Sequence, residues 1–561
     1  MGKLSEALSS SMSKLLGARG SQDDPLSSIK SVTRWVQNLP VGDAVKAHQE
    51  LLTEIKRFNE NISELSGDRL GILMLLDEKA QDLQTTLVYQ YLRNPRMART
   101  IESQLWHAIY NLNWEVVRAY HSFTLGFGRN PAKSKLEQFM PLVSLRAIRG
   151  FRQLIKWRFI RYQQPSEKVW LRLHNLYVFA ETEGFQKKSL LAYPHDTAES
   201  TCEHEYLHSL MLDQSNSGSL YPRQIDLIDR WLEVWREKLS LSKTLDTDLH
   251  VFAVDTSEDR GPRRIRNKGP EVTTRYWSTM ELLARLKTIR ASLKEGDPPA
   301  RVGLTEDARV SESLDLIEQL ERQWAPLNHR EQRRKPRQSV KKVVEIIHGL
   351  TPLIAHIKEC GGENGNNVYT DNVIYDEAAD IHVYGFVTDR TRERTNHVAR
   401  PSGLLPDTER WVMEDESECG YGTTIEAHDK DWLRVGALVG VKPDKAETWS
   451  VGIVRRLSRF GEYQSSVGIE TLPESPTLVM LYGKKTAAYE VNGIDTTGTE
   501  LPIAALILTG ENSTTLILDP AEYAHKRIFE YTHLNEKRLI QLEEMGERGE
   551  GWIRVSFCPL N

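Results

Sequence analysis

The spacing of apolar residues changes partway along this 561-residue chain, and this change most constrains the possible fold. Up to about residue 240, apolar residues recur at the three- and four-residue intervals of amphipathic helices. In the C-terminal half they alternate with polar residues or form short β-branched runs, which is typical of strands. Several domains are expected, because single hydrophobic cores usually stop growing at about 250–300 residues. The sequence therefore predicts a multidomain α + β protein.

The first 240 residues are predicted to form an all-α helical array. Short Gly, Pro, Asn and Ser breaks separate the expected helices, which span 41–62, 69–92, 97–127, 136–162, 167–183, 203–212 and 223–239. Residues 241–330 are expected to form a charged linker with a strand at 249–254, and then a helical pair, 275–294 and 311–324. We expect the helical domain to contact a protein partner.

Two β-rich units are predicted in the C-terminal half. The first, residues 331–475, is expected to be an antiparallel barrel with an insertion at about 351–409. The second, residues 476–561, is expected to be smaller. Its expected strands are 478–481, 504–508, 514–518 and 552–557, and a helix is expected at 536–545.

Charge and cysteine content exclude several classes of protein. The net charge of −5 gives the whole chain no attraction to nucleic acid polymers or anionic membranes, so anion binding needs a local basic stretch such as Arg330–Lys342. The scattered Cys202, Cys360, Cys419 and Cys558 form no zinc ribbon or disulfide framework. No apolar run approaches the roughly 20 residues of a membrane span. The N-terminal stretch lacks the apolar core of a secretory signal, so a cytoplasmic protein is expected.

A cluster of arginines precedes one of the predicted strands. Arg333, Arg334 and Arg337 lie just ahead of the β-branched run Val343–Ile347. A guanidinium group can make paired hydrogen bonds to phosphate or to the O6/N7 edge of guanine, and its flat face can stack on a base. A charge run alone is more often a solvated face. The cluster therefore carries weight only together with a second motif.

The second motif is a D-x-S-x-x-G turn made by Asp415, Ser417 and Gly420 between two strand-like runs. A carboxylate can accept hydrogen bonds from the ring N–H groups of guanine. The serine and the bare glycine backbone allow a flat base to approach closely. The two motifs together indicate a site for a guanine nucleotide.

R-x-x-x-R followed by D-x-S-x-x-G resembles the PilZ domain, a bacterial β-barrel that binds cyclic di-GMP. The segments after the second motif are also similar to that domain: 433–439 reads as a turn into a strand, 449–456 as the next strand, and 467–472 as the closing strand. The resemblance implies a cyclic di-GMP receptor with no other cofactor. It places Arg333, Arg334 and Arg337 on the phosphates and guanine edges, and Asp415, Ser417 and Gly420 on a guanine.

The chain departs from the PilZ pattern in the spacing of the two motifs, which lie closer together in the family. The insertion also contains a competing R-x-x-x-R, Arg390 to Arg394. Arg333 and Arg337 are favoured because a β-branched run follows them directly. We expect the arginine loop to fold over the ligand and so to change the angle of the helical domain. A PilZ-like scaffold that has lost its ligand remains an alternative.

His204, Glu205 and His208 spell H-E-x-x-H, the pattern of a zinc-dependent hydrolase, and Glu233 could supply a third ligand. Against this, the charged Glu203 precedes the first histidine, and such short patterns often arise by chance. We interpret the pattern as the first turn of a helix that packs on the core. The sequence therefore predicts a receptor without a metal or an enzymatic activity.

Overall fold

The computed structural model divides the chain into two compact units, residues 1–331 and 332–561. Each unit is described by itself. The structure describes residues 24–60, 65–94, 97–129, 135–266, 272–326, 338–360, 408–427, 430–444, 446–460, 463–484, 502–510, 514–533 and 536–560.

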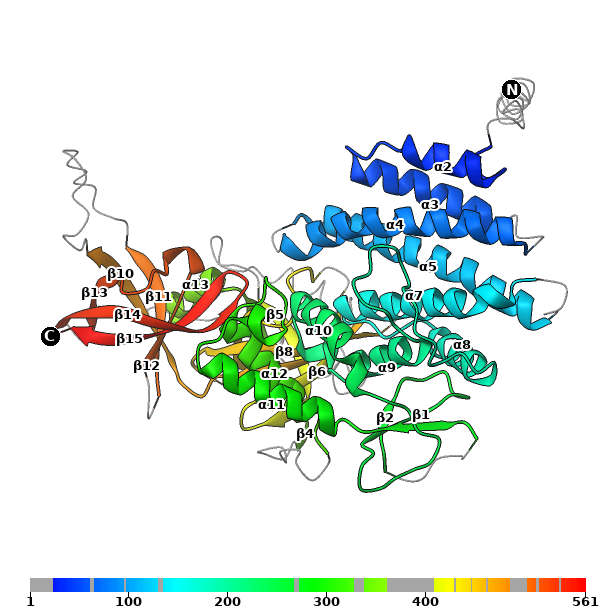
Figure 1. The fold of residues 1–561 in the computed structure, drawn as a ribbon. Coiled ribbons are helices and arrows are strands. Elements are labelled where there is room, and N and C mark those ends of the chain that lie inside the picture. Colours follow the sequence, from blue (N-terminus) through cyan, green and yellow to red (C-terminus); the bar gives the residue numbers. More distant parts are fainter. Residues whose placement is uncertain are drawn as a thin grey trace, which may run out of the picture. The chain divides into compact units, whose positions relative to one another are not determined.

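The first unit consists mainly of helices, several of which stack one upon another (Figure 1). Side-chain caps mark some of their starts: Ser66 accepts from the backbone N–H of Arg69, and Thr201 accepts from that of His204. The helices are α2 (Ile29–Gln37), α3 (Ala44–Glu60), α4 (Gly67–Arg93), α5 (Arg99–Arg129), α7 (Met140–Ile160), α8 (Val169–Thr182), α9 (Cys202–Asp213), α10 (Pro222–Trp235), α11 (Met280–Lys294) and α12 (Val310–Trp324).

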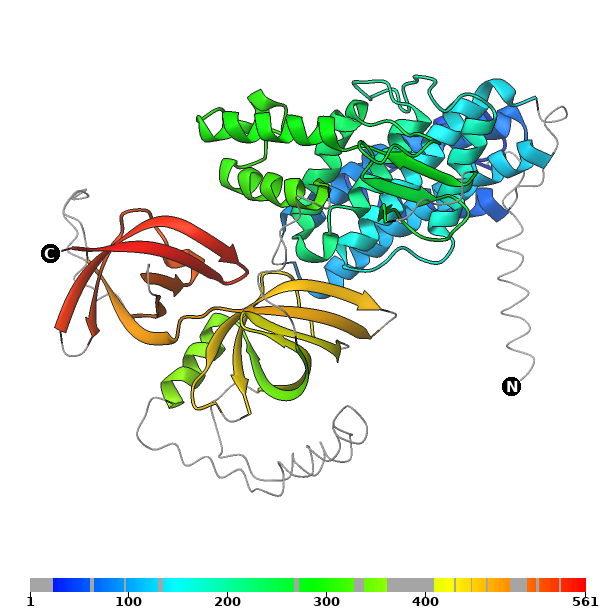
Figure 2. The same ribbon diagram turned by 90° about the horizontal axis from the view of Figure 1, so that it is seen from below.

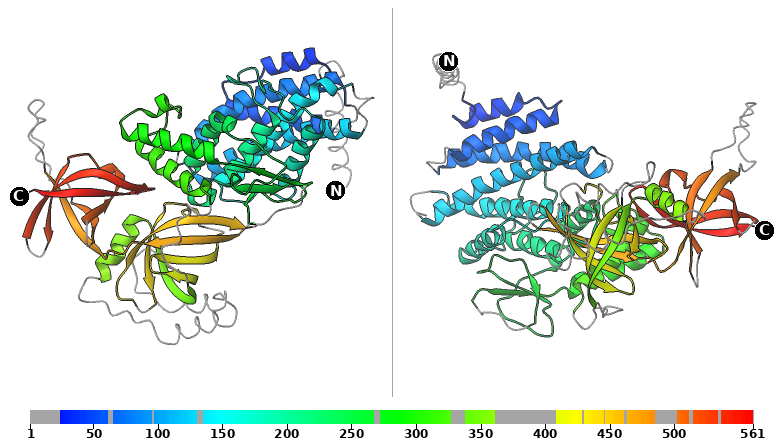
Figure 3. Two further views of the ribbon diagram at one scale, coloured as in Figure 1. Left: turned by 60° about the horizontal axis from the view of Figure 1, so that its bottom comes forward. Right: turned by 180° about the vertical axis from the view of Figure 1, so that it is seen from behind.

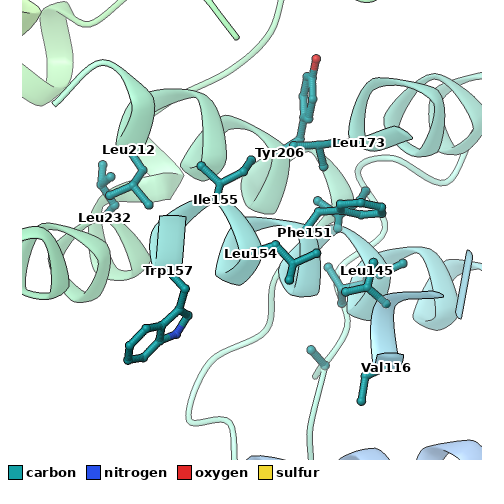
Figure 4. Close-up of a cluster of buried hydrophobic side chains, with 14 of the residues drawn as sticks. Val116, Leu145, Phe151, Leu154, Ile155, Trp157, Leu173, Tyr206, Leu212 and Leu232 are labelled. Carbon is teal, nitrogen blue, oxygen red and sulfur yellow. The ribbon is translucent and has the colours of Figure 1, made fainter. Parts of the chain in front are cut away.

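Helix α7 lies at the centre of this unit. Phe151, Leu154, Ile155 and Trp157 are all buried on it, and Figure 4 shows these side chains among apolar residues of neighbouring helices. The buried apolar residues form one continuous core from Leu26 to Trp324. Burial of apolar area on this scale is the main force that holds the stacked helices together.

A small antiparallel sheet completes the first unit. Its strands β1 (Phe252–Asp255), β2 (Arg263–Arg264) and β3 (Thr274–Trp277) are arranged in the order β2-β1-β3. Arg264, in the stretch predicted as a charged linker, donates to the backbone carbonyls of Gln323 and Ala325.

The second unit begins with a closed antiparallel barrel, seen in Figure 2. Its strand order is β4-β5-β6-β9-β8-β7. The strands are β4 (Gln338–His348), β5 (Glu409–Ser417), β6 (Gly420–Glu426), β7 (Leu438–Pro443), β8 (Ser450–Phe460) and β9 (Gln464–Thr471). Helix α13 (Leu350–Cys360) follows β4, and the rest of the expected insertion, up to residue 407, lies outside the described residues.

The C-terminal residues form a second closed antiparallel barrel, which Figure 3 shows from two sides. Its strands are β10 (Pro476–Lys484), β11 (Ile503–Thr509), β12 (Thr514–Leu518), β13 (Ile528–His533), β14 (Glu536–Gly549) and β15 (Trp552–Leu560). The order β10-β11-β12-β15-β14-β13 repeats that of the first barrel, since both run 1-2-3-6-5-4 when their strands are numbered along the chain. The predicted α + β class, with helices first and barrels after them, is confirmed.

The helix predicted at 536–545 is wrong, because these residues belong to strand β14. Glutamate, lysine, arginine, leucine and glutamine are good helix formers, but helix propensity is a weak preference that tertiary context overrides. Strand β14 pairs with β13 on one side and β15 on the other. Ile540 and Leu542 are buried, with the period of two that a strand requires.

The two barrels share a hydrophobic core, which includes Leu438 from the first barrel and Leu506 and Trp552 from the second. The indole N–H of Trp552 donates to the carbonyl oxygen of Gly436 at 3.0 Å. No helix among the described residues is long and apolar enough to cross a membrane.

Candidate nucleotide-binding site

The D-x-S-x-x-G motif forms the hairpin turn between β5 and β6. Asp415 pairs with Gly422 across the two strands, and Ser417 pairs with Gly420. The Ser417 hydroxyl donates to the carbonyl oxygen of Gly420 at 3.3 Å, which helps to close the turn. The structure therefore brings the three predicted motif residues together at one end of the hairpin.

The glycine of the motif is required by the fold itself. Gly420 has a φ of +152°, and a Cβ atom there would lie 2.0 Å from the carbonyl oxygen of Ile469 in β9. No side chain fits such a close approach of two backbones. The sequence attributed this glycine to the approach of a base, whereas the space beside it is occupied by strand β9.

A row of paired residues runs across the barrel from Asp415. Ser339 of β4 pairs with Asp415 of β5, Asp415 with Gly422 of β6, Gly422 with Gly468 of β9, and Gly468 with Arg456 of β8. Directly paired residues on neighbouring antiparallel strands project to the same face of the sheet. The row therefore presents two adjacent glycines between a carboxylate and a guanidinium group.

Both charged side chains lie over their glycine neighbours. A Cβ atom on Gly422 would lie 2.5 Å from Oδ1 and 2.6 Å from Oδ2 of Asp415. A Cβ atom on Gly468 would lie 3.3 Å from Cβ and 3.5 Å from Nε of Arg456. The two side chains thus extend toward each other across a glycine surface.

A β-bulge in β8 beside this row makes the adjacent residues Arg455 and Arg456 point in different directions. The register of β8 against β9 shifts between Val454 and Arg456, so Arg455 is the extra residue. The Arg455 guanidinium lies 2.6 Å from Glu470 and also pairs with Glu547 of the second barrel. Glu470 in β9 lies directly opposite Gly420 of the motif in the register of β9 with β6.

A second polar cluster lies on the neighbouring pairs of β4, β5 and β6. Lys342 Nζ lies 3.0 Å from Glu416 Oε1 and 5.7 Å from the centre of the Tyr421 ring. The pKa of Lys342 is raised, first by this hydrogen bond to Glu416. Burial raises the pKa of Tyr421. Lys342 therefore carries a positive charge close to the motif.

The predicted arginines Arg333, Arg334 and Arg337 lie outside the described residues, as does the competing pair Arg390 and Arg394. The description resumes at Gln338, which pairs with Glu416 in β5.

Sequence reasoning missed Gly422, Gly468 and Arg456, which the strand register brings together with Asp415. The only sequence signal was indirect: Gly422 and Gly468 each interrupt an otherwise β-branched or aromatic run. Glycine inside a strand often marks a close approach of another group.

Glu205 and His208 of the H-E-x-x-H pattern have polar partners inside the helical unit. Glu205 is buried, and its carboxylate lies 2.9 Å from Arg149, 3.3 Å from Arg152 and 2.8 Å from Arg236. Burial alone would raise the pKa of Glu205, but these three cations lower it. The carboxylate is therefore charged and already balanced.

His208 is also buried, with Nε2 at 3.0 Å from Asp229 and Nδ1 in contact with Arg152. Burial, and then the charge of Arg152, lower its pKa. A neutral imidazole donates through Nε2 and accepts through Nδ1 in this arrangement. Among the described residues, no group of three or more His, Cys, Asp or Glu side chains could hold a metal ion.

A closed six-stranded antiparallel barrel with D-x-S-x-x-G between its second and third strands defines a PilZ-type domain. Residues 30–246 match the family model described as "Cyclic-di-GMP receptor FimW, N-terminal domain". Residues 381–477 match the one described as "Cyclic-di-GMP receptor FimW, middle PilZ domain". The two ranges together cover more than half of the chain, which belongs to this family of cyclic di-GMP receptors. No curated protein and no solved structure matches it.

The matched PilZ range begins after β4, although β4 is needed to close the barrel. Arg390 and Arg394 lie inside this range, whereas Arg333 and Arg337 precede it. The second barrel lies almost wholly beyond both matched ranges.

Proposed function

We propose that this protein is a cytoplasmic, non-enzymatic receptor that binds cyclic di-GMP on the first barrel beside the β5–β6 turn. The observation that carries the proposal is the D-x-S-x-x-G turn on a PilZ-type barrel, in a chain of a cyclic di-GMP receptor family. Asp415 accepts hydrogen bonds from a guanine, and Ser417 and Gly420 hold the turn in shape. The nucleotide is the only ligand required.

Arg333, Arg334 and Arg337 clamp the phosphates and guanine edges in this proposal. The register of β4 supports this choice, because Gln338 pairs with Glu416 and thus joins the chain after Arg337 to the motif strand. Arg390 and Arg394 are the competing pair, since they fall within the matched PilZ range.

Calorimetric titration with cyclic di-GMP distinguishes the two arginine pairs. Arg333→Ala/Arg337→Ala is expected to weaken binding by about tenfold or more, because hydrogen bonds between charged groups typically contribute about 1.5–3 kcal/mol each. Arg390→Ala/Arg394→Ala is expected to bind like the wild type. The opposite result would move the clamp to the second pair.

Salt dependence separates the roles of the two motifs. The arginine variants should show a flatter dependence on salt than the wild type, since attraction to phosphate is screened. Asp415→Ala and Ser417→Ala should bind weakly but keep the wild-type slope. No binding by the wild type at any salt concentration would exclude the receptor function.

We further propose that ligand binding is relayed to the helical unit and through it to a protein partner. A candidate site for the partner is a hollow of about 380 Å³ between α5, α7 and α8, with apolar and cationic walls. Its lining includes Trp114, Arg118, His121, Leu125 and Arg172. The Arg172 guanidinium lies 5.5 Å from the centre of the Trp114 ring. An acidic segment with an apolar side chain would complement it.

Arg172→Ala tests the partner contact without touching the nucleotide site. The variant should bind cyclic di-GMP like the wild type but lose a partner that the wild type captures. A partner that binds both proteins equally would place the contact on another surface.

A further inference from the structure

The cross-strand row over β5, β6, β9 and β8 contains a residue that neither sequence motif includes. We propose that Arg456 donates to the O6/N7 edge of the guanine whose N1/N2 edge is held by Asp415, and that it thereby selects guanine. This inference rests on the proposed function of the first barrel as a cyclic di-GMP receptor.

The strand register supplies the placement. Asp415 and Arg456 stand at the two ends of one row, with Gly422 and Gly468 between them. Three strand spacings separate their backbones, a distance of about 14 Å. Both side chains lie over the adjacent glycine, so the distance between the charged groups is shorter than that between the backbones.

The β-bulge between Val454 and Arg456 explains why this arginine has that direction. The extra residue, Arg455, is held by Glu470 and Glu547. Arg456 then resumes the register opposite Gly468. Bulges re-aim side chains and are frequent beside functional sites. Arg456 is therefore the arginine of this pair that lies on the row with Asp415.

The chemistry of the row matches guanine on both edges. Guanine presents N–H donors to a carboxylate, and its O6 and N7 atoms accept the two parallel N–H groups of an arginine. The absence of a side chain at Gly422 and Gly468 lets the Asp415 and Arg456 side chains lie close to the strands, so that both charged groups are on the same face of the sheet. Adenine offers N7 but carries an N6 amino donor in place of O6, so its amino group would face the guanidinium.

A phosphate contact is the competing role for Arg456, since arginine also binds phosphate with its fork. The two roles differ in which atom of the nucleotide they require. A contact with N7 disappears when that nitrogen is replaced by carbon, whereas a phosphate contact does not depend on it.

The test is a double-mutant cycle between protein and ligand. Cyclic di-GMP and its 7-deaza analogue are titrated into the full-length wild type and into Arg456→Met, whose unbranched stem can still cover Gly468. Arg538→Met, an exposed arginine of the second barrel, is the matched control. Thermal unfolding of each variant shows whether the barrel is intact.

The wild type and Arg538→Met are expected to bind the 7-deaza analogue about tenfold more weakly than cyclic di-GMP. Arg456→Met is expected to bind cyclic di-GMP about tenfold or more weakly than the wild type and to distinguish the two ligands less than the wild type does, because its own contact with N7 is gone. An Arg456→Met variant that still separates them tenfold would overturn the proposal.

The same titrations separate this inference from the proposed function. A wild type that binds neither ligand contradicts the receptor function. If the wild type binds cyclic di-GMP, Asp415→Ala does not, and Arg456→Met still does, then only the proposed role of Arg456 is contradicted. Equal weakening of both ligands in Arg456→Met would assign the arginine to a phosphate.

Discussion

Three guanidinium groups converge on the buried carboxylate of Glu205, and they determine what the H-E-x-x-H residues do in the helical unit. Hydrolysis at a zinc site needs a glutamate that can accept a proton and two imidazoles turned to the metal. Here the carboxylate balances cations, and His208 pairs with Asp229. Removing one partner from such a buried group leaves the remaining charges uncompensated, which is strongly destabilising.

Glu205→Gln is therefore expected to lower the free energy of unfolding of the helical unit by about 3–5 kcal/mol. Glu233→Gln is the control: its side chain is 44% exposed and lies 3.9 Å from Arg236, so a change below about 1 kcal/mol is expected. Chemical unfolding followed by far-ultraviolet circular dichroism measures both.

The metal interpretation of the same residues has its own test. Elemental analysis of the purified protein should find no stoichiometric zinc, because Glu205 is held in ion pairs and His208 in a hydrogen bond to Asp229. Stoichiometric zinc that disappears in His204→Ala would restore the hydrolase hypothesis.

His48 makes the stability of the helical unit depend on pH. Its ring is fully buried in α3, and burial lowers its pKa to about 4, below the value of about 6.5 expected in the unfolded chain. Between these values only the unfolded state binds the proton. Above pH 6.5 His48 is neutral in both states and does not reduce stability. As the pH falls from 6.5 toward 4, protonation of His48 in the unfolded state lowers the free energy of unfolding by up to about 3 kcal/mol.

His48→Leu should abolish this part of the acid sensitivity. Between pH 6.5 and 4.5, the free energy of unfolding should fall less steeply in the variant than in the wild type, as measured by denaturant unfolding at a series of pH values. His195→Leu, at a 56% exposed side chain, is the control and should keep the wild-type slope. Parallel slopes for wild type and His48→Leu would contradict the assignment.

At the scale of elements, the sequence predicted correctly those elements whose structure depends mainly on interactions between residues close together in the chain. The helix predicted at 97–127 is α5, Arg99–Arg129, because apolar spacing is a local property. Strand β14 was missed because pairing with β13 and β15 outweighs its helix-forming composition. The hairpin residues Asp415, Ser417 and Gly420 could be found as a motif, but Arg456 could not. Its place depends on registers between strands that are distant in sequence.

The β5–β6 hairpin contains two glycines whose replacement should have different effects. Gly420→Ala forces a Cβ against the backbone oxygen of Ile469, so it should destabilise the barrel by more than about 1 kcal/mol. At Gly422 the three atoms nearest to a Cβ all belong to the side chain of Asp415, which can rotate away. Gly422→Ala should therefore keep its thermal stability but bind cyclic di-GMP about tenfold more weakly.

Thermal unfolding and calorimetry on both variants check this division. Gly420→Ala should unfold at a lower temperature than the wild type. Gly422→Ala should unfold at the wild-type temperature but bind cyclic di-GMP more weakly. Normal affinity in Gly422→Ala would show that displacing Asp415 does not matter for the ligand.

At the scale of the whole molecule, the second barrel repeats the strand order of the first without repeating its motif. No D-x-S-x-x-G occurs between Ile503 and Leu518, the segment that corresponds to β5 and β6. Arg455 links the two barrels, because it pairs with Glu470 beside the motif and with Glu547 in β14. The second barrel therefore packs against the first, and only the first barrel carries the motif.

Binding of cyclic di-GMP to the second unit is expected to affect the first unit. The segment from the end of α12 to the start of β4 joins them in sequence and contains the favoured arginines. A ligand can change their arrangement only if its affinity differs between the alternatives. We expect cyclic di-GMP to slow amide hydrogen exchange in residues 325–342 and to alter exchange within 274–324, whereas Asp415→Ala should show neither change at the same nucleotide concentration. The fragment 326–561 should still bind, because both motifs lie inside it. Protection confined to the first barrel would leave cyclic di-GMP binding intact but assign the output to a surface outside the helical unit.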